Sequence, residues 1–427
     1  MPDETARFGP ELRRRRLAEG WTLDRLSGRV HYSKSHLSKV ETGSKRPTPD
    51  LAKLCDAALH AGGALASLVP GRATPVQVPD ASDDGEVWVL SMNRADGSSR
   101  FAAMDRRRVT AAGAGSVLAV GLGGLRSVAD DEGTTLLKAA RSLFTQFRGL
   151  GQTSDPGLLI PALTAQTHSM EQLALTASGR TRRELLALAA RFAEYTGWMA
   201  QESGDDRAAL WWTDRAVDLA DAGGDPSFAA YGLVRRGLVH LLRGDVATTI
   251  ALTERAADEA HTPRVRGLAA QHLAQAHAVA GDHRATMHGL DRARDLLTRA
   301  AQEGDGTMIG SSHVPDLVAT YTGWCLHHLG QPARAAEVFA AEAARVPPHA
   351  QRALIRHGVR LGLAHAAAGE IEESTAVLAP LLPRLGPVRS ATIAAELRRT
   401  AQIWGRHRAN PAVKELSPDL AGALGRL

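Results

Sequence analysis

The sequence predicts an all-α protein: an N-terminal domain of five short helices, then a helical solenoid, with a small β-hairpin in the linker. Three observations favour this class. Helix N-cap residues recur through the first 70 residues. Turn signals recur later in the chain with a period of 37 to 49 residues, which is typical of helix–turn–helix solenoids. Hydrophobic residues make up 44% of the 427 residues and charged residues 23%, so the chain can bury substantial cores.

The first three helices are marked by their caps. The first covers about residues 10–19 and ends at Gly20, because glycine tolerates the positive φ of a C-cap. The second opens at the N-cap Thr22 and the third at the N-cap Ser33, each preceded by an aromatic residue that can pack on the fourth helical position. Only residues 28–31 separate these two helices, which predicts a helix-turn-helix.

A fourth helix begins at Thr48-Pro49-Asp50, where an N-cap, a proline at the first position and an acid in the first turn coincide. Its apolar residues fall on one face, and Cys55 among them is interpreted as a small core residue. A last turn follows at residues 65–69. The first domain is therefore placed at residues 1–70.

Residues 71–129 are interpreted as a linker, because the composition changes to Pro, Asp, Ser and Gly. Two apolar stretches at residues 87–90 and 100–103 flank Asp96-Gly97, a pair typical of tight turns. This arrangement predicts a β-hairpin. The third domain, residues 130–427, is expected to hold the helical repeats.

The repeats are recognised from five aligned turns. The turn glycines are Gly204, Gly244, Gly281, Gly330 and Gly369. A small residue lies seven positions before each of them: Gly197, Gly237, Ala274, Gly323 and Gly362. Another lies five positions after each: Ala209, Thr249, Thr286, Ala335 and Ser374. Small residues at these positions would let the two antiparallel helices of each repeat approach closely.

The positive charge is concentrated at the N-terminus. The chain has 51 Lys+Arg and 46 Asp+Glu, a net charge of +5, and residues 1–70 alone hold 12 basic and 8 acidic residues. A basic first domain on a nearly neutral body is typical of a nucleic-acid contact domain joined to a separate module.

Two cysteines, far apart in the sequence, exclude a disulfide framework and favour a reducing cytosol. The chain opens without a secretory signal, and its most apolar run, residues 111–125, is too short and glycine-rich to span a bilayer. A cytoplasmic protein, associated with the nucleoid when bound to DNA, is expected.

The first domain carries a motif that runs from Leu12 to Thr48. It reads Leu12-Arg13-x-x-Arg16-x-x-x-Gly20-Trp21-Thr22, then Leu26-Ser27, then Ser33-x-x-x-Leu37-Ser38-x-x-Glu41-x-Gly43, then Arg46-Pro47-Thr48. This motif resembles the lambda-repressor/Cro-like (XRE) helix-turn-helix domain over residues 8–69. The body resembles tetratricopeptide (TPR) repeats, and the whole arrangement is similar to actinomycete XRE regulators with a TPR-like C-terminal region.

The resemblance implies a DNA-binding site on the helix that opens at Ser33. In that family the helix lies in the major groove and its N-terminal residues face base edges. The implied base contacts are Lys34, Ser35, His36 and Lys39. The implied phosphate contacts, which position the protein without reading sequence, are Arg13, Arg16, Thr22, Arg25, Ser38, Thr42, Lys45 and Arg46.

The chain departs from the family pattern at two positions. Leu23 stands where a glutamine commonly contacts phosphate, and His31 stands where the turn commonly has glycine, so His31 must tolerate or avoid the left-handed region. Glu41 is interpreted as a structural acid that ties the following loop or pairs with an arginine.

No motif in the sequence indicates catalysis or a cofactor. The histidines lack the spacing of metal ligands: His272 and His277 are five residues apart, and neither an HExxH motif nor a Cys-His cluster occurs. The run Gly121-x-Gly123-Gly124 lacks the ending of a phosphate loop. We expect a protein that is not an enzyme and that uses neither a cofactor nor a metal.

The repeats are expected to form a concave groove. Residues just before the turn glycines are candidates to line it: Trp198, Gln201, His240, His277 and His327. The function predicted from all of this is a sequence-specific transcriptional regulator that binds a double-stranded DNA operator, with a body that forms a homodimer, binds a peptide or small-molecule effector, or does both. Two alternatives remain: a TPR-type interaction scaffold with a vestigial or auxiliary DNA-binding domain, and an enzyme that uses the body.

Overall fold

The computed structural model describes residues 7–69, 86–92, 99–105, 130–303, 309–310, 314 and 316–427. Residues 7–69, here called the head, fold into α1 (Phe8–Ala18), α2 (Leu23–Val30), α3 (Lys34–Glu41), α4 (Pro49–Ala58) and the 3₁₀ turn η2 (Ala66–Leu68). The head therefore has four α-helices and one final 3₁₀ turn. The fifth predicted helix is reduced to this turn because it follows Gly62 and Gly63, both at positive φ, and precedes Pro70.

The predicted caps of the head are confirmed. The Thr22 hydroxyl accepts a hydrogen bond from the Arg25 amide at 3.2 Å, and the Ser33 hydroxyl accepts one from the His36 amide at the same distance. Thr48 caps α4 in the same way, with Pro49 at its first position. His31 adopts the left-handed conformation (φ 52°, ψ 39°), so the turn between α2 and α3 keeps the geometry that a glycine would give it.

The β-hairpin predicted in the linker is confirmed. Strands β1 (Glu86–Met92) and β2 (Ser99–Asp105) pair antiparallel, with Leu90 opposite Phe101. Asp96 and Gly97, the expected turn residues, lie outside the described residues. Apart from this hairpin and η2, the elements named here are helices, and the predicted all-α class is confirmed.

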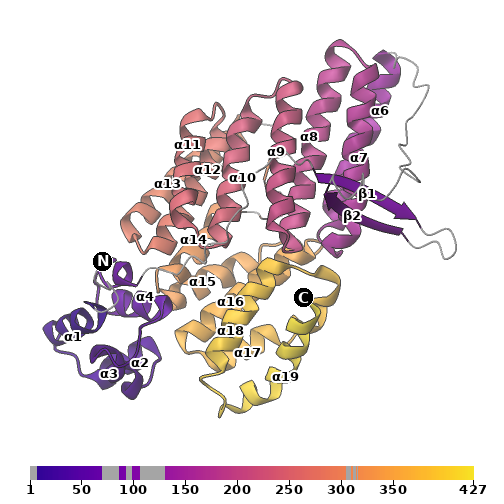
Figure 1. Cartoon of the computed structure of the whole chain (residues 1–427). Helices are drawn as coiled ribbons and strands as arrows, with labels where there is room; N and C mark the ends of the chain where they lie inside the picture. The colour runs from indigo at the N-terminus through magenta and orange to yellow at the C-terminus, as the bar shows by residue number, and fades with distance from the viewer. Residues whose placement is uncertain are drawn as a thin grey trace.

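The residues from 130 onward, here called the body, form an array of antiparallel helix pairs (Figure 1). The array begins with α6 (Asp130–Leu150) and α7 (Pro156–Thr176). Five pairs with the predicted turn glycines follow: α8 (Gly179–Glu202) and α9 (Asp206–Ala222); α10 (Ser227–Leu242) and α11 (Val246–Glu259); α12 (Pro263–Ala280) and α13 (His283–Gln302); α14 (Leu317–His328) and α15 (Pro332–Ala343); α16 (Gln351–Ala368) and α17 (Ile371–Leu378). The 3₁₀ turns η3 (Leu382–Arg384) and η4 (Gly386–Val388) lead to α18 (Ala391–Trp404) and α19 (Pro411–Arg426).

The repeat register predicted from the glycines explains how each pair packs. All five turn glycines have φ between 77° and 87°, a conformation that favours glycine. A Cβ added to Gly197 would lie 3.2 Å from the Ala209 carbonyl oxygen, so the small residues do bring the two helices close together. In the fifth pair the Ser374 hydroxyl donates to the Gly362 carbonyl oxygen at 2.7 Å. Small residues on both sides of the turn therefore hold each pair together.

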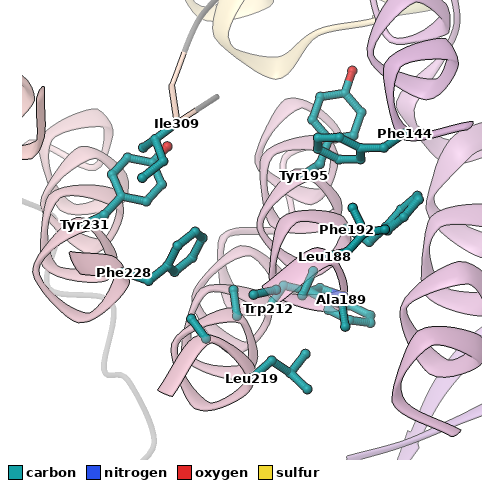
Figure 2. Close-up of a cluster of buried hydrophobic side chains, with 14 of the residues drawn as sticks. Phe144, Leu188, Ala189, Phe192, Tyr195, Trp212, Leu219, Phe228, Tyr231 and Ile309 are labelled. Atoms are coloured by element: carbon teal, nitrogen blue, oxygen red, sulfur yellow. The ribbon is translucent and has the colours of Figure 1, made fainter. Parts of the chain in front are cut away.

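Aromatic side chains fill the core of the first repeats (Figure 2). Phe144 of α6 and Phe192 of α8 meet edge to face, with ring centroids 5.0 Å apart. Phe228 and Tyr231 of α10 make a similar contact at 5.5 Å. The first contact joins α6 to the next helix pair, whereas the second lies within α10. Aromatic pairs of this geometry stabilise a core beyond the area they bury.

The head contacts the body along the edge formed by the repeat turns (Figure 1). A Cβ added to Gly330 would lie 2.5 Å from the Lys53 carbonyl oxygen of α4, and one added to Gly369 would lie 2.4 Å from the His31 ring. Gly281 lies against Ala66 in the same way. Between α18 and α19, the Arg406 guanidinium lies over the Tyr32 ring, 4.3 Å from its centroid. The turn glycines therefore also allow the head to lie close against the body.

Candidate DNA interface and candidate effector cavity

The start of α3 presents polar side chains to solvent. Lys34, Ser35 and Lys39 are exposed, whereas Leu37 and Val40 on the other side of the helix belong to the head core. The Lys34 ammonium pairs with the Asp24 carboxylate at 2.8 Å, and both side chains are more than half exposed. An exposed pair of this kind contributes little to stability, so Lys34 can exchange Asp24 for another partner at small cost.

His36 differs from the other three residues predicted to contact bases. Its side chain is half-buried, its ring meets Tyr32 edge to face at 5.1 Å, and its Nε2 atom is buried without a hydrogen-bond partner in the part of the chain that the structure describes. Burial lowers the pKa of His36, and the nearby cations Lys45, Arg406 and Lys39 lower it further. His36 therefore lies at the border between the exposed face of α3 and the contact with the body.

The residues predicted to contact phosphate surround α3 on the same domain. Six of them are exposed and one, Ser38, is half-buried; the exposed ones are Arg13, Thr22, Arg25, Thr42, Lys45 and Arg46. The Arg25 guanidinium stacks over the Trp21 ring, 4.7 Å from its centroid, which orients it beside the start of α2.

Arg16, the eighth residue predicted to contact phosphate, has a different position. It is only 7% exposed. Its Nε and Nη2 atoms donate to the two carboxylate oxygens of Glu41 at 2.6 and 2.8 Å, and Nη1 donates to the Trp21 carbonyl oxygen at 2.7 Å. Each guanidinium nitrogen donates one of these bonds, so Arg16 is not held as an exposed phosphate contact in this structure. Arg16 instead joins α1 to α3, and the structural interpretation of Glu41 is confirmed.

A cavity of about 480 Å³ lies inside the body. Its walls come mainly from the first helix of successive pairs: α8, α10, α12, α14, α16 and α18. Aromatic rings from three of these helices line it: Tyr195, Trp198, Tyr231, Tyr321 and Trp324. Cavities of about 300–1,000 Å³ with apolar walls and a few polar groups are typical small-molecule sites.

Two of the five residues predicted for the groove line this cavity. Trp198 and Gln201 do, whereas His240, His277 and His327 are not among its lining residues. His240 instead contacts Asp245, the N-cap of α11, with Nδ1 3.1 Å from the carboxylate. The predicted groove residues therefore coincide with this cavity at Trp198 and Gln201 only, although other residues at helix ends, such as Glu202 and His328, line it as well.

Buried charged side chains form part of the cavity wall. Arg352 is 1% exposed and donates to the carbonyl oxygens of Gly151, Ser154 and Arg389 at 2.7 to 2.8 Å. These bonds connect α16 to the loop after α6, which is about 200 residues earlier in the chain. They also connect α16 to Arg389, just before α18. Arg352 therefore fixes the curvature of the array so that its two ends meet.

Glu202 at the end of α8 completes this network. Its carboxylate accepts hydrogen bonds from Arg356 at 2.5 Å and from Ser390 at 2.5 Å, and lies 3.4 Å from Arg352. Burial alone would raise the pKa of Glu202, but Arg356 and Arg352 outweigh it and lower the pKa to about 2. The carboxylate is therefore ionised and held by two arginines.

The arginines of α16 are functional candidates that were not predicted from the sequence. Arg352, Arg356 and Arg360 all line the cavity. Their spacing of four residues places them on one face of a helix, so the pattern was visible in the sequence. An arginine row of this kind is common on solvated helix faces, and only the packing of α16 against α18 and α8 shows that this one is buried.

Comparison with known proteins identifies the class of the head. Residues 7–68 match the family model described as a helix-turn-helix domain. No curated protein matches the sequence. Among solved structures, the crystal structure of a Rap protein complexed with competence and sporulation factor is similar to this chain at 13% identity and a TM-score of 0.42, over 69% of this chain and 97% of that one. The family match thus identifies the head as a helix-turn-helix domain.

Within the described ranges, no group of three or more His, Cys, Asp or Glu side chains is placed to hold a metal ion. Across that same part of the chain, every helix is too short or too polar to cross a membrane.

Proposed function

We propose that the protein is a sequence-specific DNA-binding transcriptional regulator of the XRE type, whose TPR-like body dimerises, binds an effector, or does both. The observation that carries the proposal is the capped pair of α2 and α3 with Lys34, Ser35 and Lys39 exposed at the start of α3. The match of the head to the helix-turn-helix domain supports it. The proposal includes an actinomycete source, a cytoplasmic location and no catalytic role.

The exposed groups of α3 suit the major groove. A lysine ammonium donates to the O6 and N7 atoms of guanine, and a serine hydroxyl can donate to or accept from a base edge. The positive end of the α2 helix dipole and the exposed Arg25 beside it suit a phosphate. Lys45 and Arg46 in the loop after α3 suit the next phosphates along the groove.

Dimerisation is proposed because one helix-turn-helix makes few base contacts. Proteins of this class bind two half-sites about 34 Å apart, one helical turn of DNA, and so need two heads at a fixed distance. The body is the part of the chain large enough to hold them. Sedimentation analysis of the full-length protein should give a dimer, and the selected DNA site should contain two related half-sites. A monomer that binds a single half-site specifically would contradict this part of the proposal.

The DNA-binding part is tested by selecting a duplex from a random library and measuring its affinity by fluorescence anisotropy at several salt concentrations. We expect the log of the affinity to fall by about 0.9 per phosphate neutralised for each tenfold rise in salt. The selected duplex should bind about 10³-fold or more tightly than a scrambled one. The Lys34→Ala/Lys39→Ala variant should lose most of this difference.

A matched control is Lys138→Ala, which removes an exposed lysine from α6 of the body. It should bind both duplexes as the wild type does. If no duplex is enriched, or if the Lys34→Ala/Lys39→Ala variant keeps the full preference, the alternative of an interaction scaffold with a vestigial head replaces the proposal.

A further inference from the structure

We propose that the cavity of the body binds a small organic anion, with its flat or apolar part among the aromatic side chains and its acidic group at the head-facing end beside Arg399. This inference deepens the effector part of the proposed function and rests on it. It concerns the cavity lined by α8 to α18, and it is independent of which DNA the head reads.

The shape of the cavity favours a small molecule. Its volume of about 480 Å³ lies in the range of small-molecule sites. The bonds of Arg352 to Gly151, Ser154 and Arg389 bring the first and last helices of the array together. An extended peptide needs an open groove along the array, whereas this arrangement gives a site of limited length.

The walls suit a ring or another flat apolar group. Trp198 and Tyr321 line the cavity on different helices, and each has a guanidinium over its ring at 5.8 Å: Arg352 over Trp198 and Arg360 over Tyr321. Arginine stacked on an aromatic ring is held in a fixed plane, which preserves a flat surface beside it. A flat ligand can add to such a stack without rearranging it.

The charges of the lining favour an anion. Six arginines line the cavity: Arg148, Arg235, Arg352, Arg356, Arg360 and Arg399. Four acids line it, and the three glutamates are each paired with lining arginines: Glu202 with Arg352 and Arg356, Glu194 with Arg235, and Glu396 with Arg360. The histidines add no charge at neutral pH, because burial lowers the pKa of both His272 and His357 to about 4. The lining therefore has an excess of positive charge.

The excess is greatest where the cavity faces the head. Arg399 of α18 is exposed and contacts His328 at 3.5 Å. Burial lowers the pKa of His328, and the positive charges of Lys53 of the head, Arg399 and Arg360 lower it further. Burial also lowers the pKa of Lys53 to about 8; Asp50 opposes this effect and Arg399 adds to it. An anion placed beside Arg399 would relieve this repulsion.

Several buried polar atoms of the lining, both donors and acceptors, have no hydrogen-bond partner among the described residues, and two of them illustrate the set. These two are Nε of Arg356 and Oε1 of Gln271, a residue that is 1% exposed. Buried polar atoms in native proteins are nearly always hydrogen-bonded to protein, water or ligand. The lining therefore has hydrogen-bonding capacity beyond what its own side chains use.

The test uses two fluorescent probes of the same shape with the full-length protein. The first is 1-anilinonaphthalene-8-sulfonate, an aromatic anion, and the second is N-phenyl-1-naphthylamine, which lacks the sulfonate. We expect the anion to bind at one site per chain at least tenfold more tightly than the neutral probe, and to raise the unfolding temperature of the protein as a ligand of the native state does. Equal affinity for the two probes would overturn the inference.

Two pairs of variants locate the site. Arg399→Gln should weaken binding of the anion at least threefold and leave the neutral probe unchanged, while Arg398→Gln, on an exposed neighbour that does not line the cavity, should change neither. Ala395→Trp should block both probes because Ala395 lines the cavity, whereas Ala340→Trp on an exposed position of α15 should block neither. If the two variants of either pair changed probe binding equally, the anion would not lie in this cavity beside Arg399. Unfolding curves of all four variants show whether they are folded.

Displacement of the bound probe then distinguishes the kind of acid. 1-Naphthoate and 1-naphthyl phosphate carry the acidic group on the same ring, and 1-naphthalenemethanol carries an uncharged group. Displacement by either anion but not by the alcohol supports the inference and identifies a carboxylate or a phosphate ligand. Displacement by all three alike would overturn it. Because no DNA is present, a failure here leaves the DNA-binding proposal untouched, and the reverse also holds.

Discussion

The head and the body use charged residues in opposite ways. In the head the lysines of α3 are exposed, and Lys34 has only an exposed partner in Asp24. In the body the arginines of α16 are buried or half-buried and hold a carboxylate, carbonyl oxygens and aromatic rings. Exposed charges contribute little to stability and remain available to a partner, whereas buried ones are costly to remove. Substitutions on the exposed face of α3 should therefore have little effect on the fold of the head, whereas substitutions of the buried arginines of α16 should destabilise the body.

The largest effect is expected at Arg352 of the body. Arg352→Met would leave three carbonyl oxygens without their donor and remove one of the two arginines that hold Glu202. Breaking a buried pair from one side costs about 3–5 kcal/mol. Denaturant unfolding should show this loss, and Arg255→Met, which removes an exposed pair with Glu259, should cost less than about 1 kcal/mol. Equal small effects would contradict the role of Arg352 in closing the array.

The head has one buried pair, and it provides the next prediction. Arg16→Met would leave the Glu41 carboxylate buried without its arginine, at a cost of about 3 kcal/mol. Arg14→Met removes an exposed pair with Glu11 on the same helix and is the control. Tryptophan fluorescence of Trp21, beside this pair, would follow the unfolding of the head. A head that stays as stable as the wild type would show that Arg16 is not structural and would restore its availability to DNA.

Stability should depend on pH mainly through the body. The pKa values of His272 and His357 are about 4 in the folded protein, below the ordinary value of 6.5, because burial disfavours the charged form. Their contribution is therefore complete above pH 6.5 and is lost as the pH falls from 6.5 to 4. In that window each histidine should lower the free energy of unfolding by about 1.4 kcal/mol for each unit that the pH falls.

Unfolding free energies at pH 7, 6 and 5 test this expectation. His357→Gln should reduce the slope of the unfolding free energy against pH by the contribution of one histidine. His283→Gln, at an exposed position of α13, should leave that slope unchanged. A pH dependence that is the same in both variants would contradict the neutral, buried state of His357.

The features that could be predicted from the sequence are those set by neighbouring residues, and those set by distant residues could not. Thr22, Ser33 and Thr48 act within three residues of their own position, so their caps are readable locally. The turn glycines repeat, so the register of the body is readable too. Arg352 meets oxygens about 200 residues away, and no local pattern indicates that contact.

Arg16 shows the limit of transferring roles by motif. Its position in the helix-turn-helix pattern suggested a phosphate contact, and the same pattern contains Glu41, its actual partner. Assigning Arg16 to DNA and Glu41 to the fold separated the two partners of one ion pair. Similarly, His240 was assigned to the groove from its place before a turn, although Asp245 in that turn is its partner.

The smallest effect is expected where the two regions meet. Arg406→Ala removes the guanidinium that lies over Tyr32 and should loosen the contact of head and body by about 0.5–1 kcal/mol. A double-mutant cycle with Tyr32→Leu, followed by hydrogen exchange of α4, measures this coupling. Arg408→Ala, in the same loop, is the matched control. Additive effects in the cycle would show that the stacked pair does not couple the head to the body.

The central claim, that the exposed face of α3 reads DNA, is tested most directly by comparing Lys39→Ala with Lys45→Ala on the selected duplex and on its scramble. The account predicts that Lys39→Ala lowers the ratio of the two affinities, because a base contact is lost, at a cost of about 1–3 kcal/mol. Lys45→Ala should weaken both duplexes about equally and reduce the salt dependence, because a phosphate contact is lost. An unchanged ratio in Lys39→Ala would contradict the account.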